Sequence, residues 1–237
     1  MHFSVNKLFE YLIEILPYIR VTFVYVFLSL LLGLFFGGIL LFMRQSKIRI
    51  LNILSIAYVN VIRCIPSVVL LFLIFYGLPM VLRHFFHMEI NSSNRIVYVI
   101  VTFTLFESAN CCETFRSALN AVDRGQYEAA LAVGMNGFQA MKRIVIPQAM
   151  KVAVPNIGNS VMFLIKEGAL AYTIGLQDIF GRGSYLSSLT YNTYNVEIYL
   201  DMFIIYWPFI MILEYIFSKI EKSLDFEKKR KELLVQK

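Results

Sequence analysis

The feature that most constrains this chain is a series of five long apolar stretches, at residues 18–43, 53–82, 96–121, 155–177 and 198–220. Each is at least about as long as the ~20 residues that a helix needs to cross a bilayer. The chain is 58% apolar and 16% charged, whereas soluble domains average about 45–50% apolar and roughly 25% charged residues. The sequence therefore predicts an all-α, polytopic integral membrane protein with about five transmembrane helices. The alternative is an unusually apolar soluble helical protein.

Two segments depart from a simple straight span. Pro66 and the run Gly77-Leu78-Pro79 interrupt the second stretch, and because internal prolines kink or break helices, this helix is expected to be broken. Before the first span, residues 1–17 place apolar side chains at helical spacing, namely Leu8, Phe9, Leu12, Ile15 and Leu16. That spacing predicts an amphipathic helix that lies on the membrane surface.

The distribution of basic residues predicts which side of the membrane each segment faces. Fifteen Lys and Arg residues fall in one set of alternate loops and the carboxyl-terminal tail, against five on the opposite side. Cytoplasmic loops carry the excess of Lys and Arg, so the segment 122–154 and the tail 221–237 are expected in the cytoplasm and the amino terminus outside. Seven of these residues lie between Lys219 and Lys237, where anionic lipid headgroups attract them. The net charge of +6 therefore indicates membrane lipid, and not nucleic acid, as the partner.

The long cytoplasmic segment is patterned as two short helices. Asp123 suits an N-cap position, and Gly134 suits the left-handed residue that ends a helix. Asn136 suits the N-cap of a second helix, which Pro147 is expected to end. A flexible tether would contain more Gly, Ser and Pro. The pattern therefore predicts a compact docking element.

This segment also contains a motif that identifies a family. Its residues are Glu128-Ala129-Ala130, Gly134 and Ile144-Val145-Ile146-Pro147, and together they resemble the EAA loop of type I ABC importer permeases, here about residues 123–147. Ile146 replaces the leucine of the family pattern. Four runs resemble the polar amino acid uptake branch, which includes histidine, glutamine, arginine and cystine permeases: Gly125 to Ala130, Ile146 to Ala149, Tyr76 to Pro79 and Glu113 to Arg116. The resemblance covers about residues 18–220.

The resemblance implies a permease subunit of an ATP-driven amino acid importer in the bacterial cytoplasmic (inner) membrane. In such importers two permeases, identical or homologous, pair with an ABC ATPase dimer, and an extracytoplasmic solute-binding protein delivers the substrate. The EAA loop is implied to dock in a cleft of the ATPase and to transmit nucleotide-driven closure to the spans. The residues that this role assigns are Glu128, Ala129, Ala130, Gly134, Ile144 and Pro147. The alternative for Glu128 is that it only stabilises its own helix N-terminus.

Signatures of cofactor and metal binding are missing from the sequence. The phosphate-binding loop Gly-x-x-x-x-Gly-Lys-Ser/Thr does not occur, so ATP with Mg²⁺ is expected on the partner ATPase and no cofactor on this chain. The histidines and cysteines lack the spacing of metal ligands; they are His2, His84, His87, Cys64, Cys111 and Cys112. No metal site and no enzymatic activity are therefore expected.

Four charged residues are predicted to lie near the middle of the membrane: Arg63, Glu107, Lys166 and Glu167. At 1.5 Å per residue, each is about 15–18 Å inside its span, and ionisable groups at that depth usually mark function or a buried pair. Two cations and two anions could receive the carboxylate and ammonium groups of a zwitterion. The alternative is that Arg63 pairs with Glu107, or Lys166 with Glu167, and that the pairs only hold helices together.

Two further residues join this group. Arg63-Cys64-Ile65-Pro66 resembles an Arg-Gly-Thr-Pro motif that lines the pathway of the family, and Lys166-Glu167 resembles its Lys-Asp pair. Ser160 lies about two turns before Glu167, on the same helix face. The predicted substrate pathway is therefore Arg63, Pro66, Glu107, Ser160, Lys166 and Glu167. Because Ser160 offers no carboxylate, a neutral zwitterionic amino acid or cystine is the expected substrate. A basic amino acid or another small solute is the alternative, since Glu107 could serve a cationic side chain.

The sequence gives less support to two alternative functions. A polytopic membrane enzyme would use Glu107, Glu113 or Glu167 as an acid or base, but no nucleophile–base arrangement accompanies these residues. Such an enzyme would also leave the EAA loop without a role. An ion channel would need a ring-forming selectivity segment, and none is recognisable.

Overall fold

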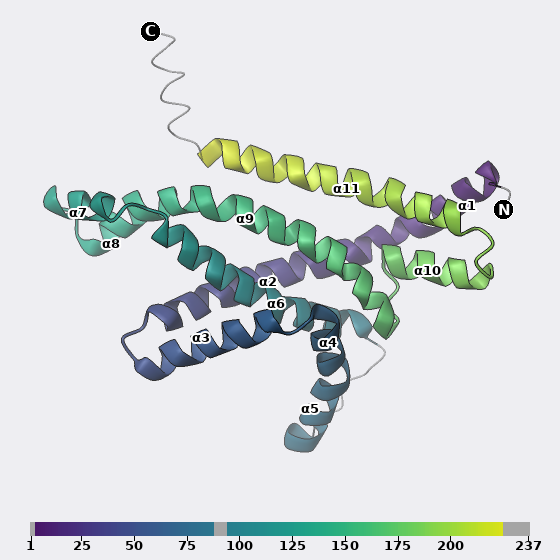
Figure 1. Ribbon diagram of the computed structural model, residues 1–237, viewed down its shortest axis with the longest axis horizontal. Helices are drawn as coiled ribbons and strands as arrows, with labels where there is room; N and C mark the ends of the chain where they lie inside the picture. Colours follow the sequence, from purple (N-terminus) through teal and green to yellow (C-terminus); the bar gives the residue numbers. More distant parts are fainter. Residues whose placement is uncertain (1–2, 88–93, 225–237) are drawn as a thin grey trace, which may run out of the picture.

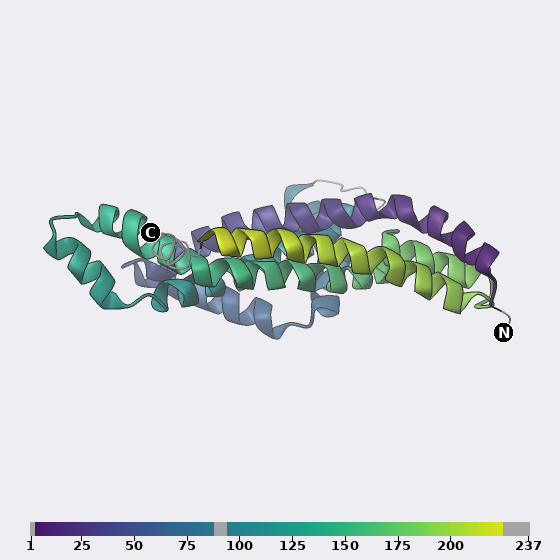
Figure 2. The ribbon, with the colours of Figure 1, turned by 90° about the horizontal axis from the view of Figure 1, so that it is seen from above.

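The computed structural model describes residues 3–87 and 94–224, and within these ranges every regular element is a helix (Figure 1). Four helices run along the length of the molecule: α2 (Ile19–Gln45), α6 (Arg95–Asn120), α9 (Ile146–Glu167) and α11 (Asn195–Leu224). Figure 2 shows the molecule from above as a narrow, elongated bundle, with α11, α9 and α2 running side by side. The all-α fold that the sequence predicts is confirmed.

The packing of α2 against α6 forms the centre of the bundle. Small residues let two membrane helices approach closely, and a Cβ atom added to Gly33 would lie only 2.6 Å from the Cβ of Glu107. Tyr25 of α2 and Phe103 of α6 are both buried, with ring centroids 5.9 Å apart. The two helices therefore form a closely packed frame, which orients the other faces of α6.

The second apolar stretch is broken, as predicted. α3 (Arg49–Cys64) ends before Pro66, because a residue that precedes proline is driven out of the helical region. The chain continues as α4 (Ser67–Phe72), a π-helical turn and α5 (Leu78–Phe86). Figure 1 shows α4 and α5 turning away from the long axis, and α5 contains no buried residue. The break separates a helix that packs along α2 and α6 from an arm formed by α4 and α5. In this arm Leu70 and Leu71 of α4 pack into the bundle, whereas the rest of the chain covers α5 little.

Four helices in the described part of the chain are long and apolar enough to cross a membrane, one fewer than the sequence predicts. They are Val5–Gln45, Ser67–Phe86, Arg95–Asn120 and Asn195–Leu224. The expected span at 155–177 is occupied by α9 and the 3-10 helix Gly168–Ile174. α9 carries two asparagines, a serine and a Lys-Glu pair, which make it more polar than the others. It nevertheless packs along α6 and α11 inside the bundle.

The amino-terminal helix forms as predicted. α1 (Val5–Ile15) continues through a 3-10 turn at Leu16–Tyr18 into α2. Its buried residues, Tyr11 and Ile15, pack against α10 (Ile179–Leu189) and α11. Protein therefore covers part of the apolar face of α1, and the position of this helix on the membrane surface stays a prediction.

Both predicted short helices are present at one end of the bundle, as α7 (Arg124–Ala132) and α8 (Gly137–Ala140) (Figures 1 and 2). The Asp123 carboxylate accepts a hydrogen bond of 2.8 Å from the backbone of the first turn of α7. Gly134 ends this helix with φ of +88°, a left-handed conformation that glycine adopts without strain. Asn136 forms a capping box with the residue three positions later, through bonds of 2.9 and 3.1 Å. Local capping therefore defines both helices.

Pro147 does not end the second helix, contrary to the sequence prediction. α8 continues through a π-helical turn at Met141–Val145 into α9, and Pro147 occupies the first turn of α9. Proline is tolerated at that position because the N–H that it lacks would have no helical partner. The two short helices are therefore joined to α9 without a flexible linker.

Candidate functional site

The first candidate region is the coupling segment, defined as residues 123–147. On α7, Glu128 and Ala129 are exposed, whereas Ala130 is only 5% exposed. Glu128 and Tyr127 border a hollow of about 280 Å³ between α7 and the π-helical turn. The helix thus presents a carboxylate and a small residue outwards, and keeps a small residue at its packed face.

Large apolar side chains are exposed on the same segment. The side chains of Val133 and Phe138 are 76% and 73% exposed, and Leu131 is 41% exposed. Ile144 and Pro147 are half-buried. Exposed apolar groups that cluster at one end of a molecule mark an interaction surface.

The second candidate region is a polar cavity of about 580 Å³ between α6, α9 and the end of α3. Its lining residues are Arg63, Phe106, Asn110, Glu113, Thr114, Ser117, Asn156, Asn159, Ser160 and Phe163. The rings of Phe106 and Phe163 stack with centroids 6.3 Å apart and an interplanar angle of 26°. The volume lies in the range of about 300–1,000 Å³ that is typical of small-molecule sites.

Two of the ten lining residues of this polar cavity are charged. Arg63 is exposed and has no ion-pair partner in the described ranges. Glu113, in contrast, is held by two arginines. The other lining residues offer amide and hydroxyl groups or aromatic rings, so Arg63 supplies the available charge.

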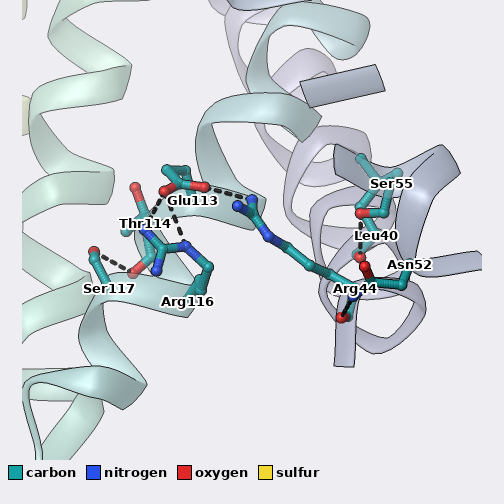
Figure 3. A network of polar contacts seen from close by, with 8 residues as sticks. All are labelled: Leu40, Arg44, Asn52, Ser55, Glu113, Thr114, Arg116 and Ser117. Carbon is teal, nitrogen blue, oxygen red and sulfur yellow. Dashed lines mark hydrogen bonds and ion pairs between the residues drawn. The ribbon is translucent and has the colours of Figure 1, made fainter. Parts of the chain in front are cut away.

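Figure 3 shows how the Glu113 carboxylate is held. One oxygen accepts a hydrogen bond of 2.6 Å from an Nη atom of Arg44. The other accepts a bond of 2.9 Å from Nε of Arg116 and a second bond from a terminal nitrogen of the same guanidinium. Arg44 lies in the last turn of α2, so this arginine–glutamate cluster (Arg44, Glu113 and Arg116) ties α2 to α6.

Of the predicted pathway residues, Arg63 and Ser160 line the polar cavity, but Glu107 does not. Glu107 is fully buried, lies against Gly33 of α2 and is close to Ser160. One of its oxygens accepts a bond of 3.4 Å from Sγ of Cys111, and the other has no partner among the described residues. The alternative in which Arg63 pairs with Glu107 is therefore wrong.

The remaining predicted residues lie at the break in the second span. Glu167, at the end of α9, accepts a hydrogen bond from the hydroxyl of Ser67, the first residue of α4. Pro66 precedes this serine, and Lys166 is exposed. Glu167 and Lys166 form no ion pair with each other in the described structure. Because Glu167 follows Ser160 by seven residues, it lies about 10 Å farther along α9 than that serine, and about one turn beyond Phe163, the last lining residue on this helix.

The sequence pattern did not assign most of the cavity lining to the substrate pathway. The residues that it did not assign to the pathway are Phe106, Asn110, Glu113, Thr114, Ser117, Asn156, Asn159 and Phe163. Their spacing is a signal that the sequence contains: polar residues recur every three or four positions along α6 and α9. Polar side chains on one face of a membrane helix usually face the bundle interior or an aqueous cavity. Which two faces oppose each other is visible only in the structure.

The fold and these two regions define a class of membrane protein that has a polar cavity between its helices and a docking segment at one end. Residues 29–225 match the family of binding-protein-dependent transport system inner membrane components, and the chain belongs to this family. The L-cystine transport system permease protein TcyL of Bacillus subtilis (strain 168) is 34% identical, over 94% of this chain and 92% of its own length. The probable amino-acid permease protein YxeN of the same strain is 36% identical, over 91% of this chain and 92% of its own length.

Solved structures share the fold. One chain of an amino acid ABC transporter with histidines superposes with a TM-score of 0.81 at 27% identity, covering 94% of this chain and all of that chain. A chain of the MetNI methionine ABC transporter in an inward-facing conformation reaches a TM-score of 0.67 at 20% identity, covering 93% and 99%. The predicted family and importer permease fold are confirmed. The chain is a permease subunit and not an enzyme, and its family implies a separate ATPase and a binding protein as partners.

Proposed function

We propose that this chain is the transmembrane permease of an ATP-driven amino acid importer and that the polar cavity is part of its substrate path. The observation that carries this proposal is the presence of Arg63, a guanidinium without an ion-pair partner in the described structure, beside amide and hydroxyl groups. A guanidinium binds a carboxylate through paired, charge-assisted hydrogen bonds. Amides and hydroxyls serve a polar side chain as donors and acceptors. The relatives named for cystine and amino acid transport support the same substrate class.

The substrate that this lining favours is a neutral zwitterionic amino acid or cystine. Its carboxylate would bind Arg63, and Ser160 would donate to or accept from its polar groups. Glu167 would take the ammonium group at the level of the helix break, in exchange for its bond to Ser67. Lys166 and Pro66 flank that level of the path. The alternative, a basic amino acid, would need a carboxylate that is free to face its side chain.

The coupling segment is the surface that would dock on the ATPase. Glu128, Ala129 and the exposed apolar side chains would be covered by the partner. Gly134 would permit close approach of the partner, and Ala130 would let α7 pack closely on its inner face. Ile144 and Pro147 connect this surface to α9 without a flexible linker, so nucleotide-driven closure would move the helix that carries Ser160. ATP with Mg²⁺ would bind on the ATPase dimer, and no cofactor on this chain.

The assembly would include a second permease, either another copy or a homologue, and an extracytoplasmic solute-binding protein. The amino terminus would lie outside and the carboxyl terminus in the cytoplasm of a bacterial inner membrane. Thiol labelling tests this orientation in a Cys64→Ala background. An impermeant maleimide should label Tyr191→Cys, whose native side chain is 91% exposed, and should not label Val133→Cys in intact cells. Labelling of the second variant would reverse the orientation.

Reconstituted transport tests the proposed function. Proteoliposomes that contain the permease, its ATPase and its binding protein should take up L-cystine or a neutral amino acid such as L-glutamine when ATP is supplied. Arg63→Gln should reduce this uptake roughly ten- to hundredfold, because a hydrogen bond to a charged group contributes about 1.5–3 kcal/mol. Arg49→Gln, at an exposed position that begins the same helix, is the matched control. Unchanged uptake by the Arg63 variant would refute the cavity as the path.

A further inference from the structure

The charges around the polar cavity are strongly unequal. Its lining contributes one cation, Arg63, and one carboxylate, Glu113. The carboxylate is paired with Arg44 and Arg116, which are not part of the lining. These four residues carry a formal charge of +2, since three are arginines. Within this group of four the positive charges exceed the negative one, although the cavity wall itself contains one acidic and one basic residue.

The bonding of Glu113 leaves little of its charge to attract a substrate. Each carboxylate oxygen accepts from a guanidinium, at 2.6 Å from Arg44 and at 2.9 Å from Nε of Arg116. The side chains of Glu113 and Arg44 are only 22% and 20% exposed, so water screens this pair less than it would screen a surface pair. Charge-assisted bonds of this kind are among the strongest in proteins. A substrate ammonium would have to displace an arginine to reach the carboxylate.

Arg44 is itself held in place by contacts from α3. The side-chain amide of Asn52 donates to the backbone carbonyl of Arg44. Ser55 donates a bond of 2.7 Å to the carbonyl of Leu40, one turn earlier in α2. Figure 3 shows these contacts beside the arginine–glutamate cluster. Because its backbone is anchored on α3, Arg44 is positioned to remain on Glu113 while substrates enter and leave.

The other acidic side chain of this region does not compensate for the paired carboxylate. Glu107 is fully buried against α2, and a Cβ on Gly33 would already clash with its side chain. Glu107 is close to Ser160, but only the serine lines the polar cavity. Among the described residues that line the cavity, a cationic side chain therefore finds no carboxylate that is free of an arginine.

We propose that Arg44 and Arg116 determine the charge selectivity of the polar cavity by neutralising Glu113, so that amino acids with a cationic side chain are rejected. The inference rests on the proposed function and deepens it, because it assigns selectivity to a residue of α2 that does not line the site. Removal of Arg44 lowers the formal charge of the four-residue group from +2 to +1, and removal of both Arg44 and Arg116 lowers it to 0. Each step should make the cavity more accepting of L-arginine.

Equilibrium binding to the purified permease–ATPase complex tests this proposal without the binding protein, whose own selectivity would mask the effect. The complex is held in lipid nanodiscs, and the probes are radiolabelled L-glutamine, L-cystine and L-arginine. In the wild type L-glutamine should bind and L-arginine should compete weakly. Arg44→Gln should strengthen competition by L-arginine by roughly three- to tenfold, because removal of one unit charge near the cavity weakens the repulsion of the cationic side chain. Arg44→Gln/Arg116→Gln should strengthen it further.

Two control variants separate charge from structure. Arg44→Lys keeps the cation and should retain the wild-type preference. Lys47→Gln removes an exposed cation three residues away, outside the arginine–glutamate cluster, and should change nothing. If Arg44→Gln does not assemble with the ATPase, the more exposed Arg116→Gln provides the same test.

The outcomes distinguish this inference from the proposed function. If L-glutamine and L-cystine both fail to bind the wild type and all variants, the cavity is not a substrate site and both ideas are wrong. If a neutral probe binds but the preference over L-arginine is the same in every assembled variant, the role of Arg44 and Arg116 is refuted while the proposed function stands. A graded gain in arginine binding along the series would support the inference.

Discussion

The coupling segment and the polar cavity are built in opposite ways. The coupling segment is a local structure: Asp123, Gly134 and Asn136 cap two short helices through contacts within a few residues. The polar cavity is assembled from α3, α6 and α9, whose lining residues lie up to 100 positions apart, from Arg63 to Phe163. The first region depends on backbone conformation and the second on how helices are rotated against one another.

This difference suggests a separate role for each region. The coupling segment exposes apolar side chains at one end, where a partner would cover them, and it joins α9 directly. The polar cavity lies beside the closely packed α2–α6 frame. A change in the coupling segment should therefore impair energy transfer without impairing substrate binding, and a change around the cavity should do the reverse.

The largest effect is expected from Gly134→Leu. Its φ of +88° is strained for leucine by about 1–2 kcal/mol, and the new side chain would project from the end of α7 at the docking surface. ATP-driven uptake should fall to background while the protein still inserts and accumulates. Gly134→Asn, which tolerates the left-handed region better, should retain part of the transport. Normal uptake by the leucine variant with its ATPase bound would contradict the docking role.

A smaller effect, on stability, is expected from Gly33→Ala in the α2–α6 frame. The added Cβ would lie 2.6 Å from the Cβ of Glu107, so the helices must move apart. Overpacking of this kind costs about 1–3 kcal/mol, which corresponds to a loss of roughly 5 °C in Tm. Thermal unfolding of the purified protein measures it, with Gly38→Ala as control, because no atom lies within 4 Å of a Cβ there. Equal Tm values for the two variants would show that the α2–α6 contact is looser than described.

The smallest effect is expected from Ser67→Ala at the break in the second span. The variant loses the hydrogen bond that links α4 to Glu167 at the end of α9. Because such a bond contributes about 1 kcal/mol, the arm formed by α4 and α5 should open about fivefold more readily. The rate of ATP hydrolysis by the permease–ATPase complex without binding protein should rise by a similar factor. Ser67→Thr keeps the hydroxyl and should hydrolyse ATP at the wild-type rate. An unchanged rate in the alanine variant would mean that this bond does not restrain the arm.

The same difference explains what the sequence could and could not predict. The caps of the coupling segment were predictable because each depends on a single residue type at a fixed offset. Even there, Pro147 was misjudged, since proline ends one helix and begins another equally well. For Glu107, the position along the helix predicted how deep in the membrane the side chain lies, but not which neighbouring helix it faces. Its side chain lies against Gly33 of α2, a contact that local spacing does not reveal.

The polar lining was missed for a related reason. Asn110 and Glu113 on α6 and Asn156 and Asn159 on α9 are spaced as helix faces, but spacing alone does not reveal that the two faces oppose each other. The arginine–glutamate cluster is further from prediction, since Arg44 is 69 residues from its partner. Contacts between distant helices depend on packing rather than on local pattern.

The most direct test of the central claim is to measure substrate binding and ATPase association on the same two variants, Arg63→Gln and Gly134→Leu. Binding of radiolabelled L-glutamine or L-cystine to the purified permease reports on the polar cavity, and co-purification with the ATPase reports on the coupling segment. We expect Arg63→Gln to lose substrate binding and to co-purify with the ATPase. We expect Gly134→Leu to keep substrate binding and to lose co-purification with the ATPase. Loss of both properties in both variants would contradict the separation of the two regions.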